Sequence, residues 1–187
     1  MPITVTPTKE IPDVLIIEPK VFGDARGWFY ESFNQKEFSE KTGIQKPFVQ
    51  DNHSFSKQYI LRGLHYQMEQ SQGKLVRVTH GKVFDVAVDL RQSSPTFGKW
   101  TGTELSSENH RQFWVPEGFA HGFVVLSEEA HFLYKTTDYW HQASEQCIIW
   151  NDSTLQIDWH LPEGITPNLN PKDAQGKSWE EAIKFLV

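Results

Sequence analysis

The sequence of 187 residues has few of the features that would assign it to several common functional classes. It contains one cysteine, Cys147, so no disulfide can form within the chain, which fits a reducing compartment. No run reaches the roughly 20 apolar residues of a membrane-spanning helix. Residues 1–5 have neither the basic region nor the apolar run of a secretory signal peptide. We therefore expect a cytoplasmic protein with no membrane partner.

Motifs for phosphate loops and for nucleophilic catalysis are also missing. Neither G-x-G-x-x-G nor G-x-x-x-x-G-K occurs, so a bound phosphate must be held by side chains. There is no G-x-S-x-G turn, and Cys147 lies in an apolar run that predicts a buried, inert thiol. The formal net charge of −6 argues against general binding of nucleic acid.

Apolar and polar residues alternate along much of the chain, which predicts short β-strands separated by turns. We expect strands at 13–18, 28–33, 74–79, 82–90, 100–105, 112–115, 122–126, 130–136 and 147–150. The two strands on either side of the turn His80-Gly81 form the clearest predicted hairpin. This pattern predicts an all-β jelly-roll sandwich or barrel in one domain, 1–187.

A few short helices are expected at the periphery. Asn34 is a predicted N-cap, with Glu37 as its capping-box partner and Gly43 as the stop. Residues 161–171 are predicted to form a loop, and Ser178 is predicted to open a last helix with Glu181. The N-terminal strands are candidates for exchange with a second subunit, because an open sheet edge needs covering.

Two histidine-containing runs carry the first chemical signal. His65 lies in Arg-Gly-Leu-His-Tyr-Gln and His121 ends Pro-Glu-Gly-Phe-Ala-His; histidines in such a Gly-punctuated β context line the interior of cupin barrels. A metal site would need His-x-His and a nearby acid, but Gln67 and Lys74 occupy those places. His65 is thus either a general base or a core histidine, and His121 either contacts a substrate or is structural.

Other candidates depend on strand periodicity. Lys74 and Arg77 should point to opposite faces of their strand; a buried Lys74 would need an anion such as an enolate or phosphate, whereas most lysines are solvated. Tyr134 is either a proton donor facing the base or core filling. Candidates for holding an anion through charged side chains are Arg26, Arg62 and Lys172.

Taken in chain order, these segments resemble the dTDP-4-dehydrorhamnose 3,5-epimerase family. The matching runs are 22–27, 33–34, 48–54, 61–67, 73–78, 81–91, 94–98, 114–122 and 132–139. The resemblance implies a jelly-roll cupin, a homodimer, and no metal or organic cofactor. It also implies inversion of C3 and C5 of a dTDP-4-keto-6-deoxyhexose, in the pathway to dTDP-L-rhamnose.

The resemblance also implies residue roles. His65 matches the family's base, Tyr134 its proton donor, and Lys74 the residue near the keto oxygen. Asp173 matches the carboxylate that orients the histidine. Substrate-contacting positions correspond to Arg26, Glu31, Gln50, Asp51, Asn52, Arg62, His121, Glu145 and Lys172. Trp140 stands where many members have a second tyrosine.

Three other functions compete with this one. A relative could epimerise a single carbon or act as a 3,4-ketoisomerase on a related nucleotide sugar. A metal-dependent cupin is disfavoured by Gln67. A non-catalytic sugar-nucleotide-binding cupin is disfavoured by the set His65, Lys74 and Tyr134, because binding alone needs neither a base nor a proton donor.

Overall fold

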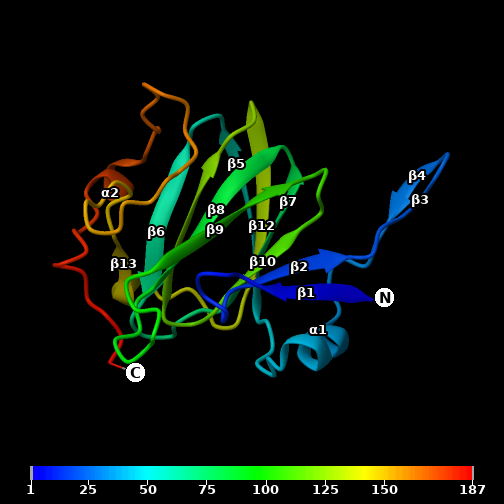
Figure 1. Ribbon diagram of the computed structural model, residues 1–187, viewed down its shortest axis with the longest axis horizontal. Helices are drawn as coiled ribbons and strands as arrows, with labels where there is room; N and C mark the ends of the chain where they lie inside the picture. The colour runs from blue at the N-terminus through cyan, green and yellow to red at the C-terminus, as the bar shows by residue number, and fades with distance from the viewer. Residues whose placement is uncertain (1, 187) are drawn as a thin grey trace.

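Two antiparallel sheets make up most of the computed structural model, which describes residues 2–186 (Figure 1). The larger sheet has the order β1 (Ile3–Pro7), β2 (Leu15–Pro19), β10 (Gln112–Val115), β7 (Lys74–His80), β12 (Glu129–Thr136) and β5 (Gln50–Lys57). The smaller has the order β13 (Glu145–Cys147), β6 (Leu61–Gln67), β11 (Phe119–Val125), β8 (Lys82–Asp89) and β9 (Trp100–Ser106). Neighbours in each sheet are mostly distant in sequence, as in a jelly roll. The predicted all-β cupin fold is confirmed.

The predicted hairpin around His80-Gly81 is wrong. Strands β7 and β8 follow each other along the chain but lie in different sheets, β7 between β10 and β12, and β8 between β11 and β9. Gly81, with φ +76°, makes the turn where a Cβ would lie 2.0 Å from the Glu129 carbonyl oxygen. The sequence of a turn does not tell whether its two strands pair or separate.

Strand β8 is apolar between its ends except at Asp85, because both of its faces are covered. Val83 and Ala87 belong to the core between the sheets, whereas Phe84, Val86 and Val88 pack on the other face. That second face is covered by the C-terminal segment, including Leu155, Trp159 and Ala182. Burial on two sides explains why residues 83–88 contain a single polar side chain, Asp85.

The helices agree only in part with the prediction. Helix α1 (Gln35–Thr42) begins as expected, because Asn34 Oδ1 accepts a hydrogen bond from the Glu37 N–H at 3.2 Å, and it ends at Gly43 in the left-handed region. The Glu37 carboxylate instead accepts the Ile3 N–H at 2.9 Å, so the capping box is not reciprocal. The sequence predicted no further helix between this one and Ser178.

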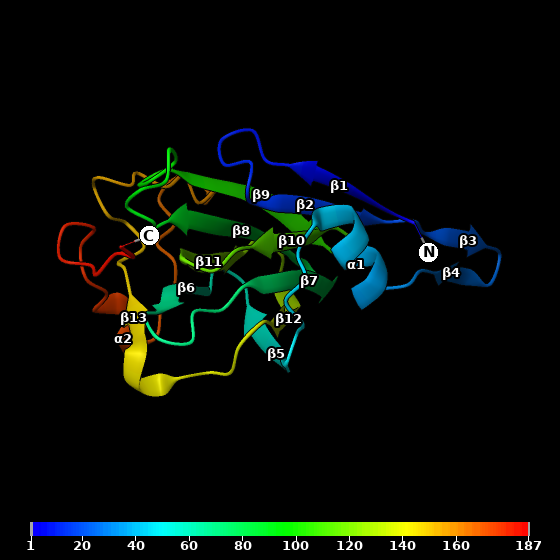
Figure 2. The same ribbon diagram turned by 90° about the horizontal axis from the view of Figure 1, so that it is seen from below.

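The C-terminal segment differs most from the prediction. The Ser178 hydroxyl donates to Glu181 at 2.8 Å, but this forms a turn and no helix follows within the described residues. The sequence did not predict the four-residue helix α2 (Pro171–Ala174), whose N-cap is Asn170. The strand expected at 147–150 lies earlier, as β13. Helix α2 and β13 lie together at one end of the molecule (Figure 2).

The predicted strand 28–33 is also shorter than expected. It ends at Phe29, as β4 (Gly27–Phe29), which pairs with β3 (Phe22–Asp24) in a separate two-stranded sheet. This two-stranded hairpin extends away from the main sheets in both views (Figures 1 and 2). In the described part of the chain no helix is long and apolar enough to cross a membrane.

Candidate active site

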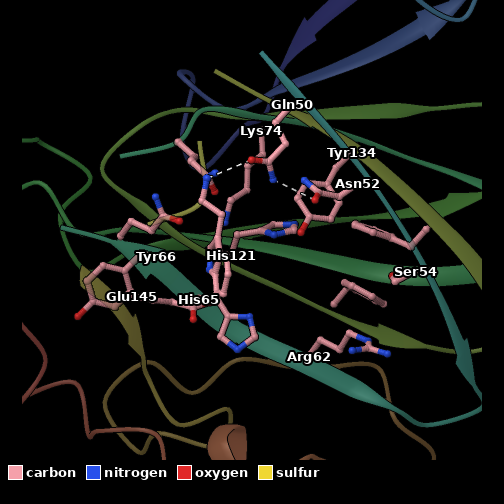
Figure 3. A pocket seen from close by; sticks show the side chains of 15 residues that line it. Gln50, Asn52, Ser54, Arg62, His65, Tyr66, Lys74, His121, Tyr134 and Glu145 are labelled. Atoms are coloured by element: carbon pink, nitrogen blue, oxygen red, sulfur yellow. Dashed lines mark hydrogen bonds between the residues drawn. The ribbon is translucent and has the colours of Figure 1, made fainter. Parts of the chain in front are cut away.

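A cavity of about 340 Å³ lies between the two sheets, and most of the predicted site residues line it (Figure 3). Both sheets contribute to it, together with the segment that precedes β13. The predicted residues that the structure brings together here are Gln50, Asn52, Arg62, His65, Lys74, His121, Tyr134 and Glu145. Side chains separated by nearly a hundred positions in sequence therefore share one pocket.

His65, on β6, is paired with Asp173 of α2. The imidazole Nε2 lies 2.6 Å from Asp173 Oδ1, and the other carboxylate oxygen accepts the Gly63 N–H at 3.1 Å. Asp173 is fully buried. Burial alone would raise the pKa of Asp173, but the hydrogen bond and charge of His65 and the Gly63 amide hold that pKa below its ordinary value. The carboxylate therefore stays ionised and fixes the Nε2 side of the ring.

Backbone geometry brings Gly63 close to the neighbouring strand. Its φ is +120°, and a Cβ there would lie 2.6 Å from Gly122 Cα. Only glycine fits this close approach. At this position the Gly63 amide donates to Asp173, so the glycine supports the dyad that Asp173 forms with His65.

Tyr134 lies on the wall opposite His65. It belongs to β12 of the larger sheet, whereas His65 belongs to the smaller one, and both side chains line the cavity (Figure 3). Burial and the negative charge of Glu145 raise the pKa of Tyr134, although Arg62 acts in the opposite direction. The phenol is therefore protonated at neutral pH and can donate.

Lys74 begins β7 and lines the same cavity, while Arg77 lines a separate hollow on the outer face of the sheet. The alternation of the strand thus separates the two cations as predicted. Burial lowers the pKa of Lys74 to about 8, against the charges of Asp85 and Glu145, which raise it. Lys74 is a buried cation close to losing its proton.

His121 is held from behind by an acid that the sequence did not single out. Its Nε2 lies 2.8 Å from Oδ1 of Asp85, which is fully buried on β8. The available signal was a lone acid inside the apolar run 83–88. Buried carboxylates in such runs are rare unless paired, and only the fold identifies the partner.

Gln67, which replaces the second histidine of a metal-binding cupin, is buried and holds a loop. Its amide donates to the carbonyl oxygens of Gln70 at 2.9 Å and Tyr139 at 3.2 Å, and accepts the His141 N–H at 3.1 Å. These contacts support Trp140, which lines the cavity with half of its surface exposed. All three hydrogen bonds are to backbone groups, so the amide has a structural role.

Five predicted residues do not line this cavity in the single chain: Asp173 and Lys172 contact the lining residues His65 and Glu145, whereas Asp51, Arg26 and Glu31 lie away from it. Asp51 points to the outer face, where it pairs with Lys135 at 2.9 Å, because its neighbours Gln50 and Asn52 take the inward positions of β5. Arg26 is on the projecting hairpin and pairs with Asp24 at 2.5 Å. Glu31 lines a small hollow beside α1.

Lys172 forms an ion pair with Glu145, which lines the cavity. Lys172 is half-exposed on α2, next to Asp173 of the dyad. Helix α2, which the sequence did not predict, therefore supplies both Lys172 and Asp173.

Comparisons with known proteins all match the chain to one family. The family model described as dTDP-4-dehydrorhamnose 3,5-epimerase matches residues 8–181. A protein of that name from Pseudomonas aeruginosa is 62% identical over 175 residues, covering 94% of this chain and 96% of the relative.

Solved structures give the same result. The dTDP-6-deoxy-D-glucose-3,5-epimerase of Legionella pneumophila, solved with dTDP-4-keto-L-rhamnose, is 55% identical with a TM-score of 0.92, covering 96% of this chain and 94% of that one. A 3'-monoepimerase from Streptomyces bikiniensis, solved with dTDP-quinovose, is 29% identical with a TM-score of 0.84, covering 92% and 86%.

Proposed function

The chain belongs to the dTDP-4-dehydrorhamnose 3,5-epimerase family, and on that premise we propose how its cavity carries out the reaction. The enzyme is an isomerase that inverts C3 and C5 of dTDP-4-dehydro-6-deoxy-D-glucose to give dTDP-4-dehydro-L-rhamnose. The hydrogens at C3 and C5 both flank the C4 carbonyl, so removal of either gives an enolate. Each inversion needs a base on one face of the sugar and a proton donor on the other.

The observation that carries this assignment is the placement of His65 and Tyr134 on opposite walls of one cavity. His65 is the base, because its Nε2 is committed to Asp173 and Nδ1 is left to take the carbon-bound proton. Asp173 fixes this tautomer and stabilises the imidazolium that forms, as buried carboxylates do for other catalytic histidines. Tyr134 returns a proton to the opposite face, since its raised pKa keeps the phenol protonated.

Lys74 stabilises the enolate oxygen. A buried ammonium gains most when negative charge develops beside it, and that charge grows from the carbonyl toward the transition state. The low polarity that depresses the pKa of Lys74 also strengthens this interaction.

The rest of the cavity binds the nucleotide. Arg62 supplies a planar guanidinium for the diphosphate, and Trp140 offers an aromatic face for thymine. Asn52 Nδ2 is buried without a partner among the described residues, although Asn52 Oδ1 accepts from Gln50 at 3.0 Å. We assign that free N–H to the substrate. His121, Glu145 and Lys172 complete the substrate contacts.

We propose that residues 1–187 form one domain that works as a cytoplasmic homodimer. The projecting hairpin has an exposed aromatic surface, with Trp28 61% and Phe29 64% exposed, which a monomer rarely presents to water. Packed on a partner, the hairpin would bring Arg26 to the other cavity, and Glu31 would follow two residues after the hairpin ends. If so, Arg26→Ala and His65→Asn, each inactive alone, regain activity when their subunits are mixed; no regain would refute the shared site.

A direct test is to incubate the purified protein with dTDP-4-keto-6-deoxy-D-glucose in heavy water and analyse the product by NMR. We expect deuterium at both C3 and C5 and an L-rhamno-configured ketosugar. Deuterium at one carbon would indicate a mono-epimerase, and movement of the keto group a 3,4-ketoisomerase. His65→Asn should abolish exchange at both positions, while His80→Asn, an exposed histidine outside the cavity, should not.

Metal chelators should leave the rate unchanged, because each proposed step uses a side chain of this chain. A loss of activity that added metal restores would support the metal-dependent alternative.

A further inference from the structure

Asp85 is a buried carboxylate directly behind the cavity wall, and none of the steps above uses it. It lies on β8 between apolar neighbours and is fully buried. One oxygen, Oδ1, pairs with His121 Nε2 at 2.8 Å. The other, Oδ2, is buried and has no hydrogen-bond partner among residues 2–186.

Such a group is costly to the fold. An unpaired, desolvated carboxylate oxygen lowers stability, and apolar residues in place of a buried ion pair are often neutral or stabilising. The residues on both sides of Asp85 along the strand are buried and apolar, so the carboxylate stands alone among hydrophobic positions. Residues that impose a cost of this kind are concentrated at functional sites.

The cavity floor contains two carboxylate–imidazole pairs side by side. His65 and His121 are direct partners across β6 and β11, and each ring is backed by an acid, Asp173 and Asp85 respectively. The two acids differ in one respect. The second oxygen of Asp173 accepts a hydrogen bond from the Gly63 N–H, whereas that of Asp85 has no donor in the described part of the chain. Burial raises the pKa of Asp85, and His121 and Lys74 oppose that rise. The ionised carboxylate and the Lys74 cation therefore favour each other.

We propose that Asp85 is a positioning residue for the epimerisation: it fixes the proton of His121 on Nε2 and holds Lys74 as a cation where the enolate oxygen forms. This inference rests on the proposed function, because it assigns Asp85 to the same reaction. With Nε2 protonated toward Asp85, His121 presents Nδ1 as its remaining polar atom to the cavity.

The charges around Lys74 support this assignment. The titratable and charged groups that share the cavity with Lys74, or lie directly behind its wall, are Arg62, His65 and Tyr66 on β6, Asp85 on β8, His121 on β11, Tyr134 on β12 and Glu145 on β13. Only Asp85 and Glu145 raise the pKa of Lys74 against its burial. Glu145 is already paired with Lys172, so Asp85 is the anion whose charge is less fully compensated.

The main experiment is Asp85→Asn, which keeps the shape of the side chain and removes its charge. We expect kcat to fall about 10- to 100-fold, the size of loss typical when a group that orients a site residue is removed. KM and the affinity for dTDP should stay within about 3-fold of wild type. The alkaline limb of kcat/KM should move to lower pH, because Lys74 loses the anion that favours its charged form. A wild-type kcat with an unmoved alkaline limb would overturn the proposal.

A matched control is Asp89→Asn, four residues along the same strand. Asp89 is buried but paired with Arg91 at 2.8 Å, away from the cavity. Its loss should lower stability and leave the alkaline limb in place. If both variants shift the limb equally, the effect is structural and Asp85 has no specific role.

Wild-type protein labelled with ¹⁵N-histidine provides a second measurement if Asp85→Asn does not fold. We expect the His121 resonances to show a proton on Nε2 at every pH at which the enzyme is active. A neutral ring with its proton on Nδ1 would contradict the inference. Absence of turnover in the wild type would instead refute the proposed function, so the two failures are distinguishable.

Discussion

Lys74→Met should make the protein more stable while it removes the activity. Lys74 is buried in the cavity wall, and burial lowers its pKa from 10.5 to about 8. The folded state therefore holds the charged side chain at a cost that the unfolded chain does not have. Methionine has a similar length and no charge, so the replacement tests this cost with little change in packing.

The size of the effect follows from the two pKa values. Their difference corresponds to roughly 3 kcal/mol, at about 1.36 kcal/mol for each pKa unit. Removal of Lys74 also takes a positive charge away from Asp85, which reduces the gain. We expect Lys74→Met to be more stable by about 1–3 kcal/mol at pH 7.

The pH dependence of the stability difference tests separately whether the buried charge of Lys74 is destabilising. Because the folded-state pKa is below the unfolded one, the unfolded chain binds more protons between about pH 8 and pH 10.5. The cost of the buried charge is therefore complete below pH 8 and disappears as the pH rises through that window. The advantage of Lys74→Met should shrink accordingly between pH 7 and pH 10.

Guanidinium unfolding of both proteins at pH 7 and pH 10, followed by tryptophan fluorescence, measures this difference. Lys82→Met is a suitable control, because Lys82 is a half-exposed cation whose surface ion pair with Glu104 should contribute less than about 0.5 kcal/mol to stability. The reasoning fails if Lys74→Met is less stable than wild type at pH 7, or if its advantage is the same at both pH values.

Three further substitutions test the site and its support. Asp173→Asn should lower kcat by about 10²- to 10⁴-fold with little change in KM, since the amide no longer fixes the His65 tautomer; a wild-type kcat in steady-state assays would exclude the dyad. Trp140→Ala should raise KM and weaken dTDP binding by about 10- to 100-fold if thymine stacks on it; calorimetry with unchanged affinity would place the base elsewhere. Gly63→Ala should cost about 2–4 kcal/mol of unfolding free energy because its Cβ meets Gly122, whereas Gly164→Ala, with open space around it, should cost about 1; equal losses would contradict the close approach.

Strand periodicity predicted which side chains share a face. Alternation separated Lys74 from Arg77, and the structure puts the first in the cavity and the second on the outer face. The same rule separates Asp51 from Gln50 and Asn52, so a run of three matched residues does not enter one cavity together.

Contacts between distant parts of the chain could not be predicted in this way. Asp173 meets His65 across 108 positions, on a helix of four residues that has too few turns to show periodicity. The pairing of Asp85 with His121 depends on β8 and β11 being neighbours, and the predicted β7–β8 hairpin was wrong for the same reason. Local patterns fix the faces of strands, whereas their order is set by packing across the whole chain.

Isotope exchange in Tyr134→Phe tests most directly whether an imidazole and a phenol act from opposite sides of the sugar. In heavy water this variant should incorporate deuterium next to the C4 carbonyl and return sugar of mostly unchanged configuration, because His65 still removes the proton and no donor faces it. Inversion by Tyr134→Phe at the wild-type rate would contradict the two-sided mechanism.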